Sequence, residues 1–248
     1  MSSKDGRVRW GIISTANIGM EKVTPGIQRS PHSVVTAIAS RDLAKAKAAA
    51  KRLGIPKAYG SYEELLADPE IDAVYNPLPN HLHVPLTVQA AKAGKHVLCE
   101  KPMAMNAAEA EQLRQCPKDR LVMEAFMVRF HPQWLRAREI VQSGALGELK
   151  LVNVIFSYFN NDPANVRNMA DIGGGGIMDI GCYAVVSGRF LFGAEPKRVV
   201  SLVERDPNFK TDRLAGGLAD FGNGRQLVFS CSTQLVPYQT VNAMGTKA

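Results

Sequence analysis

The sequence lacks several features that mark proteins for particular tasks or compartments. Its four cysteines, Cys99, Cys116, Cys182 and Cys231, form no C-x-x-C pair, which argues against a structural zinc site. The longest apolar stretch, near 151–156, is far too short to span a bilayer. The first ten residues contain no apolar segment of the kind found in secretory signals. These absences predict a cytoplasmic protein with free thiols, no metal site and no membrane partner.

Positive charge is in excess but is not gathered in one place. The 248 residues include 30 Lys and Arg against 23 Asp and Glu, a formal charge of +7. The basic residues are scattered, without the clustered basic stripe that a nucleic-acid groove needs. We therefore expect no nucleic-acid partner and only a modest preference for phosphate-bearing small molecules.

The first half of the chain alternates between strand and helix patterns. Short apolar runs predict strands at 8–13, 34–39, 73–76, 97–100 and 121–125. Helical patterns separate them, at 18–29 and 82–93 and after the predicted N-caps Asp42, Ser61 and Asn106. Strands joined by helices of this length predict an α/β fold with a parallel, doubly wound sheet of the Rossmann type.

The second half has a different pattern. Helices are predicted at 132–143 and 178–192, the latter after the glycine cluster Gly173–Gly176. The segment 150–159 alternates as an antiparallel strand does, and further strands are predicted at 198–203, 217–221 and 226–232. We expect an α+β domain with a mostly antiparallel sheet. The boundary falls near 125–130, which gives domains 1–126 and 127–248.

The turn between the first strand and the first helix is a candidate dinucleotide site. In the G-x-G-x-x-G fingerprint, small residues let backbone amides at the helix N-terminus approach the pyrophosphate. Here "STANIG" puts Ser14, Ala16 and Gly19 in the glycine positions, although a small-residue turn before any helix would look similar. We expect the pyrophosphate to be bound by Ser14, Thr15, Ala16, Asn17 and Ile18.

The end of the second strand bears on the choice between NADP and NAD. A site that prefers NAD has an acidic residue there for the ribose 2′-OH, but this chain has Ser40 and Arg41. Arg41 is suited to a 2′-phosphate, and Lys45 adds a second positive charge one turn later. The alternative is that Arg41 is simply solvated and Asp42 serves the ribose, so we favour NADP and keep NAD as possible.

Six segments together resemble one known family. They are "GIISTANIG", "IASRD", "PNHLH", "AGKHVLCEKP", "MEAFMVRFHPQ" and "GGGGIMDIGCYAV", and in this order they resemble the Gfo/Idh/MocA oxidoreductases over nearly the whole chain. The segment "GKHVLCEKP" is the most specific. Asp179 is followed by Tyr183 where much of the family has histidine. In this the chain is most similar to the subgroup with glucose–fructose oxidoreductase, NADP-dependent D-xylose dehydrogenase and dimeric dihydrodiol dehydrogenase.

The resemblance implies roles for the charged end of the strand at 97–100. Glu100 and Lys101 would lie beside the nicotinamide, with Lys101 touching the reacting oxygen of the substrate. Pro102 would follow through a cis bond, which is a fixed tight turn. A lysine at such a position in an unrelated protein would more often be a solvated loop residue.

The resemblance also implies a proton-transfer pair. Tyr183, with an ordinary pKa of about 10, would exchange a proton with the substrate hydroxyl. An ammonium group about 4 Å away, at an effective dielectric of about 20, favours the phenolate by about 4 kcal/mol, so Lys101 would make Tyr183 a usable base. Asp179 would orient the substrate hydroxyl or hold Lys101. Without the resemblance, Tyr183 would be read as a core tyrosine.

Other residues are assigned by the same resemblance. The "PNHLH" match implies that Asn76, Leu78, Asn80 and His83 lie along the dinucleotide. Met127, Arg129 and His131 would line the substrate end, although Met127 is equally suited to core packing.

Together these features predict an NADP-dependent oxidoreductase that acts on a cyclic sugar or a vicinal diol. The chain ends at "VNAMGTKA", which lies within the second sheet of the family, so we expect that sheet to be incomplete here. A complete sheet would support a homodimer or a higher homo-oligomer. The alternative is a dinucleotide-binding module, sensor or fragment without turnover.

Overall fold

The structure is a computed structural model, and it describes residues 6–248. The chain divides into two compact units, one ending at Ala125 and the other beginning at Phe126. No helix within residues 6–248 is long and apolar enough to cross a membrane.

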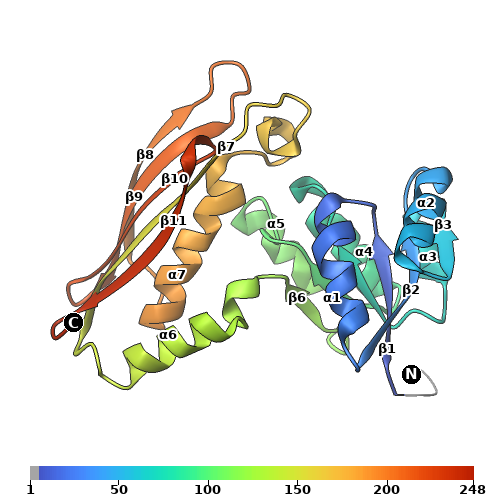
Figure 1. Ribbon diagram of the computed structural model, residues 1–248, viewed down its shortest axis with the longest axis horizontal. Coiled ribbons are helices and arrows are strands. Elements are labelled where there is room, and N and C mark those ends of the chain that lie inside the picture. Colours follow the sequence, from blue (N-terminus) through green and yellow to red (C-terminus); the bar gives the residue numbers. More distant parts are fainter. Residues whose placement is uncertain (1–5) are drawn as a thin grey trace. The chain divides into compact units, whose positions relative to one another are not determined.

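The first unit is built on a parallel sheet whose strand order is β3-β2-β1-β4-β5-β6 within the described residues (Figure 1). This is the order of a dinucleotide-binding Rossmann domain, with the reversal point between β1 and β4. The strands are β1 (Val8–Ile13), β2 (Ser33–Ala39), β3 (Lys57–Tyr59), β4 (Ala73–Asn76), β5 (His96–Cys99) and β6 (Val122–Glu124). The helices are α1 (Thr24–Arg29), preceded by the π-helical turn η1 (Gly19–Val23), then α2 (Leu43–Leu53), α3 (Tyr62–Ala67), α4 (His83–Lys92) and α5 (Ala107–Glu111), with 3-10 turns η2 (Asn80–Leu82) and η3 (Gln112–Gln115).

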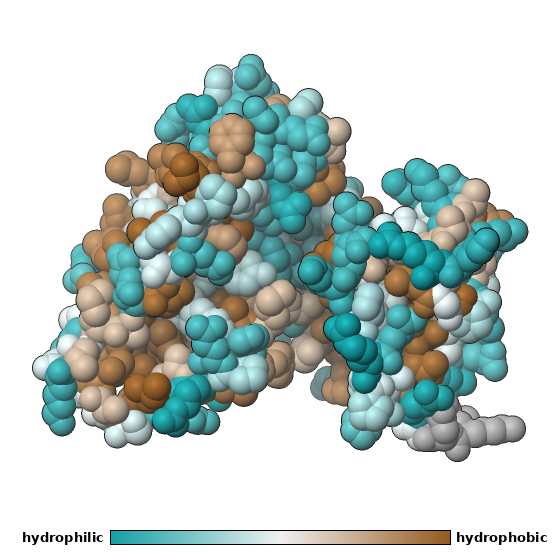
Figure 2. All heavy atoms as spheres, in the orientation of Figure 1, coloured by the Kyte–Doolittle hydropathy of each residue, from teal (hydrophilic) through white to brown (hydrophobic). Residues whose placement is uncertain are grey.

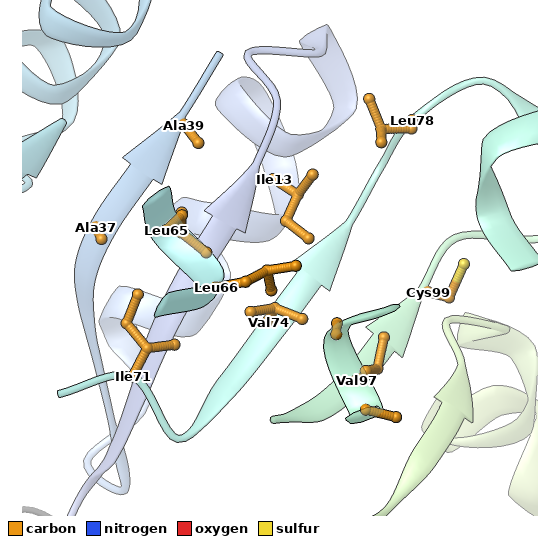
Figure 3. Packing of buried hydrophobic residues seen from close by; sticks show 12 residues of the cluster. Ile13, Ala37, Ala39, Leu65, Leu66, Ile71, Val74, Leu78, Val97 and Cys99 are labelled. Atoms are coloured by element: carbon orange, nitrogen blue, oxygen red, sulfur yellow. The ribbon is translucent and has the colours of Figure 1, made fainter. Parts of the chain in front are cut away.

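Neighbouring strand residues of this sheet enter two different cores. Ile13 and Val74 pack with α3 and α4 in one cluster, where Figure 3 shows Leu65 and Leu66 against the strands. Ile12 and the neighbouring residues of β2 and β4 pack with η1 and α2 in the other. Successive strand residues point to opposite faces, so both faces of the sheet are covered by helices.

The second unit packs two helices with a sheet of order β11-β7-β10-β9-β8 in the described chain (Figure 1). Its pairs are antiparallel except for β7 with β10, which is parallel. The strands are β7 (Leu149–Phe159), β8 (Arg198–Arg205), β9 (Asp212–Gly222), β10 (Arg225–Ser232) and β11 (Gln234–Gly245). The helices are α6 (Pro132–Gln142) and α7 (Cys182–Phe192), the latter preceded by the π-helical turn η7 (Ile177–Gly181), with 3-10 turns η4 (Met127–Arg129), η5 (Val166–Asn168) and η6 (Ala170–Ile172). Alternate residues of β7, β9 and β10 form one core with α7.

The predicted fold class is confirmed, and so are the predicted N-caps. The Asp42 carboxylate accepts from the backbone N–H groups of Ala44 and Lys45, Ser61 caps α3, and Asn106 caps α5. The sequence pattern did not predict β3 or β11. The short β3 is only half-buried and carries no clear alternation, whereas β11 gains its regularity from pairing with the distant β7.

Candidate active site

The turn after β1, which was predicted to bind the pyrophosphate, is tight and is closed by the Ser14 side chain. Ser14 has φ 98, a conformation usually left to glycine, and its hydroxyl accepts a hydrogen bond from the backbone N–H of Ala16 at 3.0 Å. The Met20 N–H donates to the Ala16 carbonyl at 3.0 Å, so the helix starts directly after the turn. First-turn N–H groups have no partner within their own helix and attract anions. Serine can thus occupy the first glycine position of the fingerprint, because its hydroxyl accepts a hydrogen bond within the turn.

The end of β2 offers a cation rather than a carboxylate. Oδ1 of Asp42 accepts both backbone N–H groups that it caps at the start of α2, so this oxygen is already hydrogen-bonded within the protein. Arg41 and Lys45 are exposed. Burial raises the pKa of Tyr62, and the guanidinium of the adjacent Arg41 opposes that rise. Ser40 is buried, and its hydroxyl accepts from the Asp42 N–H at 3.2 Å, which braces the loop that carries Arg41.

The segment after β4 is built from inward-facing side chains. Asn76 is fully buried and bonds the Leu78 N–H and the His83 carbonyl. The His83 ring is 1% exposed, with Nε2 2.6 Å from the Leu78 carbonyl and Nδ1 2.7 Å from the Pro102 carbonyl. These side chains brace the loop from inside, and the position of Asn76, Leu78 and His83 along a dinucleotide stays a prediction. Asn80 begins η2 and is only partly buried.

The Lys101 turn is fixed at several points. The Glu100 carboxylate accepts from the buried Tyr75 hydroxyl at 2.6 Å and from the Lys101 N–H at 3.2 Å. The Lys101–Pro102 bond is cis, as the resemblance implied. The Met103 N–H donates to Glu124 at 2.7 Å. The Lys101 backbone is therefore held at the carboxyl end of β5, two strands away from β1 in the same sheet.

The fully buried Tyr75 and the half-buried Glu100 form a hydrogen-bonded pair at this turn. Burial, with the neighbouring Glu100 carboxylate, raises the pKa of Tyr75, so the phenol keeps its proton and donates to Glu100. The resemblance placed Glu100 beside the nicotinamide, and Tyr75 was not predicted as its partner. The sequence motif around Lys101 identifies Glu100, but its partner Tyr75 lies on β4, 25 residues earlier in the chain.

Asp179 and Tyr183 lie four residues apart at the start of the helix formed by η7 and α7, and so share one face of it. Asp179 Oδ2 accepts from the Tyr158 hydroxyl at 2.6 Å and pairs with Arg167 Nε at 2.9 Å. Burial and the Asp179 carboxylate raise the pKa of Tyr158. The Tyr183 ring packs edge-on against Phe126, with centroids 5.0 Å apart. Tyr158 and Arg167 were not predicted as site residues.

The start of this helix is capped from a distant strand. The Asp212 carboxylate, on β9, accepts from the Ile177 N–H at 2.6 Å and is 7% exposed. Burial raises the pKa of Asp212, and the bond from the Ile177 N–H opposes the rise. A residue 35 positions away in sequence therefore orients the turn that carries Asp179.

The predicted substrate residues at the start of the second unit are accessible. Met127 is 62% exposed, so it is not part of the core, and Arg129 is exposed as well. His131 caps α6, with Nδ1 accepting from the Gln133 N–H at 3.2 Å. Their contact with a substrate stays a prediction. No cluster of three or more metal-ligating side chains occurs among residues 6–248.

Comparison with known proteins places both units in one family. The profile described as "Oxidoreductase family, NAD-binding Rossmann fold" matches residues 8–129, and the profile "GFO/IDH/MocA C-terminal domain" matches residues 134–248. The expectation of an incomplete second sheet is not confirmed by these matches. The two profiles together reach from β1 to the last described strand.

Individual relatives agree with this placement. The chain is 49% identical over 243 residues to an uncharacterized oxidoreductase of Rhizobium meliloti, covering 97% of this chain and 72% of the relative. It is 45% identical over 218 residues to D-xylose 1-dehydrogenase (NADP(+)) 2 of Haloferax volcanii, covering 87% and 66%. The crystal structure of KijD10, a 3-ketoreductase from Actinomadura kijaniata, with NADP and TDP-benzene, superposes with a TM-score of 0.91 at 29% identity, covering 97% and 74%. The chain therefore belongs to the Gfo/Idh/MocA family of oxidoreductases and carries its NAD(P)-binding Rossmann domain.

Proposed function

We propose that this protein is an NADP-dependent dehydrogenase or reductase acting on a CH–OH carbon of a cyclic sugar or a vicinal diol. Residues 1–126 form the cofactor domain and residues 127–248 the substrate domain. The observation that carries the proposal is the shared sheet edge of the first unit. The anion-binding turn of Ser14 and the anchored Lys101 turn both follow strands of one parallel sheet at their carboxyl ends.

The residues after β1 and β2 suit NADP. The backbone N–H groups of the turn would bind the pyrophosphate, because the Ser14 conformation opens the turn and its hydroxyl holds it. Arg41 would bind the 2′-phosphate with its fork of donors, and Lys45 would lie nearby. Asp42 is a weak candidate for the ribose because its Oδ1 already caps α2. The NADP named for the Haloferax relative and for the KijD10 structure supports the same choice.

The chemistry divides between cofactor and chain. NADP supplies the hydride acceptor or donor when it is bound. Tyr183 takes the proton of the substrate hydroxyl in oxidation and returns it in reduction, and Lys101 stabilises its phenolate. Asp179 orients the substrate hydroxyl. The sugar substrates named for relatives support a polyhydroxylated ligand.

The experiment measures NADP reduction with D-xylose, other aldoses and vicinal diols, using the wild type, Tyr183→Phe and Lys101→Ala. We expect both variants to lose about 100-fold or more of kcat while binding NADPH normally, since acid–base groups contribute about 10²–10⁴-fold. Tyr238→Phe is a matched control for loss of a hydroxyl, because Tyr238 is 55% exposed on β11, and we expect little effect from it. Full turnover by Tyr183→Phe would overturn the assignment.

The second sheet supports a homo-oligomer as part of this proposal. Its outer face carries exposed apolar side chains on neighbouring strands (Figure 2). They are Ile155, Val200, Leu202, Leu214, Leu218 and Met244. Contiguous exposed apolar residues commonly mark protein interfaces. We expect sedimentation to show a dimer, and Leu202→Glu with Leu218→Glu to shift it to monomer.

A further inference from the structure

The glycine cluster before η7 has a structural purpose that the proposed reaction does not yet explain. The backbone N–H groups of Gly174 and Gly175 form hydrogen bonds with the loop that contains η5. The Gly175 N–H donates to the Arg167 carbonyl at 2.8 Å, and the Gly174 N–H donates to the Met169 carbonyl at 2.9 Å. A Cβ on Gly174 would lie 2.6 Å from each of these carbonyl oxygens. Only a residue without a side chain lets the η5 loop come this close.

The η5 loop is held on its other side as well. Asn168 is 4% exposed, and its Nδ2 donates to Asn160 Oδ1 at 3.0 Å and to the Asp162 carbonyl at 2.8 Å. The backbone on both sides of the Arg167 side chain is therefore fixed. This positions the Arg167 guanidinium with its Nε 2.9 Å from Asp179 Oδ2.

The pair lies next to the proposed base. Asp179 and Tyr183 share a helix face. Burial opposes the charge of Arg167, but the Asp179 carboxylate, followed by Tyr158 and then Tyr183, raises the pKa of the guanidinium overall. Among the described residues of this unit, Arg167 from η5 interacts electrostatically with Tyr183, and Asp179 from η7 binds both Arg167 and Tyr158 of β7. Phe126 and Phe156 flank the Tyr183 ring.

We propose that Arg167 is a positioning residue of the substrate site, which fixes Asp179 and offsets its negative charge beside Tyr183. An uncompensated Asp179 would disfavour the Tyr183 phenolate, since like charges oppose ionisation. With Arg167 in place, Asp179 is kept as an oriented acceptor while Tyr183 can still give up its proton. This inference rests on the proposed function of Tyr183 and deepens it.

The first test does not depend on turnover. The chain is labelled with ¹³Cζ-tyrosine, the Tyr183 resonance is assigned by its loss in Tyr183→Phe, and its titration is followed by NMR. We expect Arg167→Gln to move the titration of Tyr183 to higher pH, Asp179→Asn to move it to lower pH, and Arg167→Lys to restore most of the wild-type behaviour. An unmoved titration in Arg167→Gln would overturn the proposal.

The second test measures kinetics with NADP and the best substrate of the aldose and diol screen. We expect Arg167→Gln to lower kcat about 10- to 100-fold, the range for losing one charge-assisted hydrogen bond, and to shift the acidic limb of the pH–rate profile upward. Arg213→Gln is the matched control, because Arg213 also holds carboxylates of this unit but lies on β9.

The outcomes separate the two claims. A wild type that oxidises no aldose or diol would count against the proposed function, while the NMR titration would still test Arg167. A wild type that turns over, with Arg167→Gln equally active and with the same pH profile, would overturn the role of Arg167 alone. NADPH binding and the melting temperature identify any variant that fails to fold.

Discussion

Replacement of Gly174 by alanine tests whether the glycine cluster serves the Arg167 loop. The added Cβ would meet two backbone carbonyls at 2.6 Å, well inside normal contact, and neither carbonyl is at the end of a flexible side chain. Overpacking of this kind costs about 1–3 kcal/mol, and weakening one of the two hydrogen bonds to the loop adds about 0.5–1.5 kcal/mol. We therefore expect the second unit to lose about 2–4 kcal/mol of unfolding free energy.

The chain offers a way to observe this unit separately. Its two tryptophans are Trp10 in β1 and Trp134 in α6, so Trp10→Phe leaves tryptophan fluorescence only in the second unit. In that background, a loss of about 2–4 kcal/mol shifts the urea midpoint by about 1–2 M when the slope is about 2 kcal/mol per molar. NADPH binding should be unchanged, because its site lies in the first unit, whereas kcat should fall with the displacement of Arg167.

A second glycine separates crowding from backbone strain. Gly193 has φ 61, but a Cβ there would meet nothing within 4 Å. Gly193→Ala should cost about 1–2 kcal/mol and leave kcat intact. A Gly174→Ala protein with the wild-type urea midpoint and full kcat would refute the explanation of the glycine cluster.

Three further predictions concern the first unit. Asp72 accepts three hydrogen bonds from Arg9, from its backbone N–H at 2.9 Å, its Nε at 2.9 Å and its Nη2 at 2.7 Å, so Asp72→Asn should cost about 1–3 kcal/mol of unfolding free energy in urea at neutral pH. The hydrogen bond from the Arg9 side chain is the largest cause that lowers the pKa of Asp72 in the folded protein. The Asp72 carboxylate therefore stabilises the fold at pH values above its unfolded pKa of about 3.9. In thermal melts, the stability difference between wild type and Asp72→Asn should shrink as the pH falls below that value. Ser14→Ala keeps the strained φ but loses the bond to the Ala16 N–H, so it should melt below Ser14→Gly, and the opposite order would exclude this account of the turn. Tyr75→Phe removes a buried donor to Glu100 and should lower stability by about 1–3 kcal/mol, a loss that denaturation would fail to show if the pair contributed nothing.

The parts of the fold that local chemistry encodes could be predicted from sequence. Asp42, Ser61 and Asn106 each reach a backbone N–H within three residues, so their signal is complete in a short window. Alternation and apolar runs likewise located β1 and β4 to the residue. β11 could not be predicted, because its pairing partner β7 lies about 80 residues earlier.

The site divides in the same way. The Lys101 turn and the Asp179–Tyr183 pair each lie within one short segment of sequence, and both were identified by resemblance. Arg167 was missed because its partner Asp179 is twelve residues away and only the approach of the η5 loop to the glycines unites them. The glycine cluster was the visible signal, since adjacent glycines often mark a close approach of backbone, but it does not say which residue approaches.

The measurement that tests the central claim most directly is a binding titration of the 248-residue chain with NADPH and, separately, with NADH. We expect NADPH to bind more tightly by about 10- to 100-fold, the contribution of a charged hydrogen bond to the 2′-phosphate. Arg41→Ala should abolish this preference, whereas Lys51→Ala, an exposed cation in the last turn of α2, should keep it. Equal binding of the two nucleotides by the wild type, or an unchanged preference in Arg41→Ala, would contradict the assignment of NADP to this site.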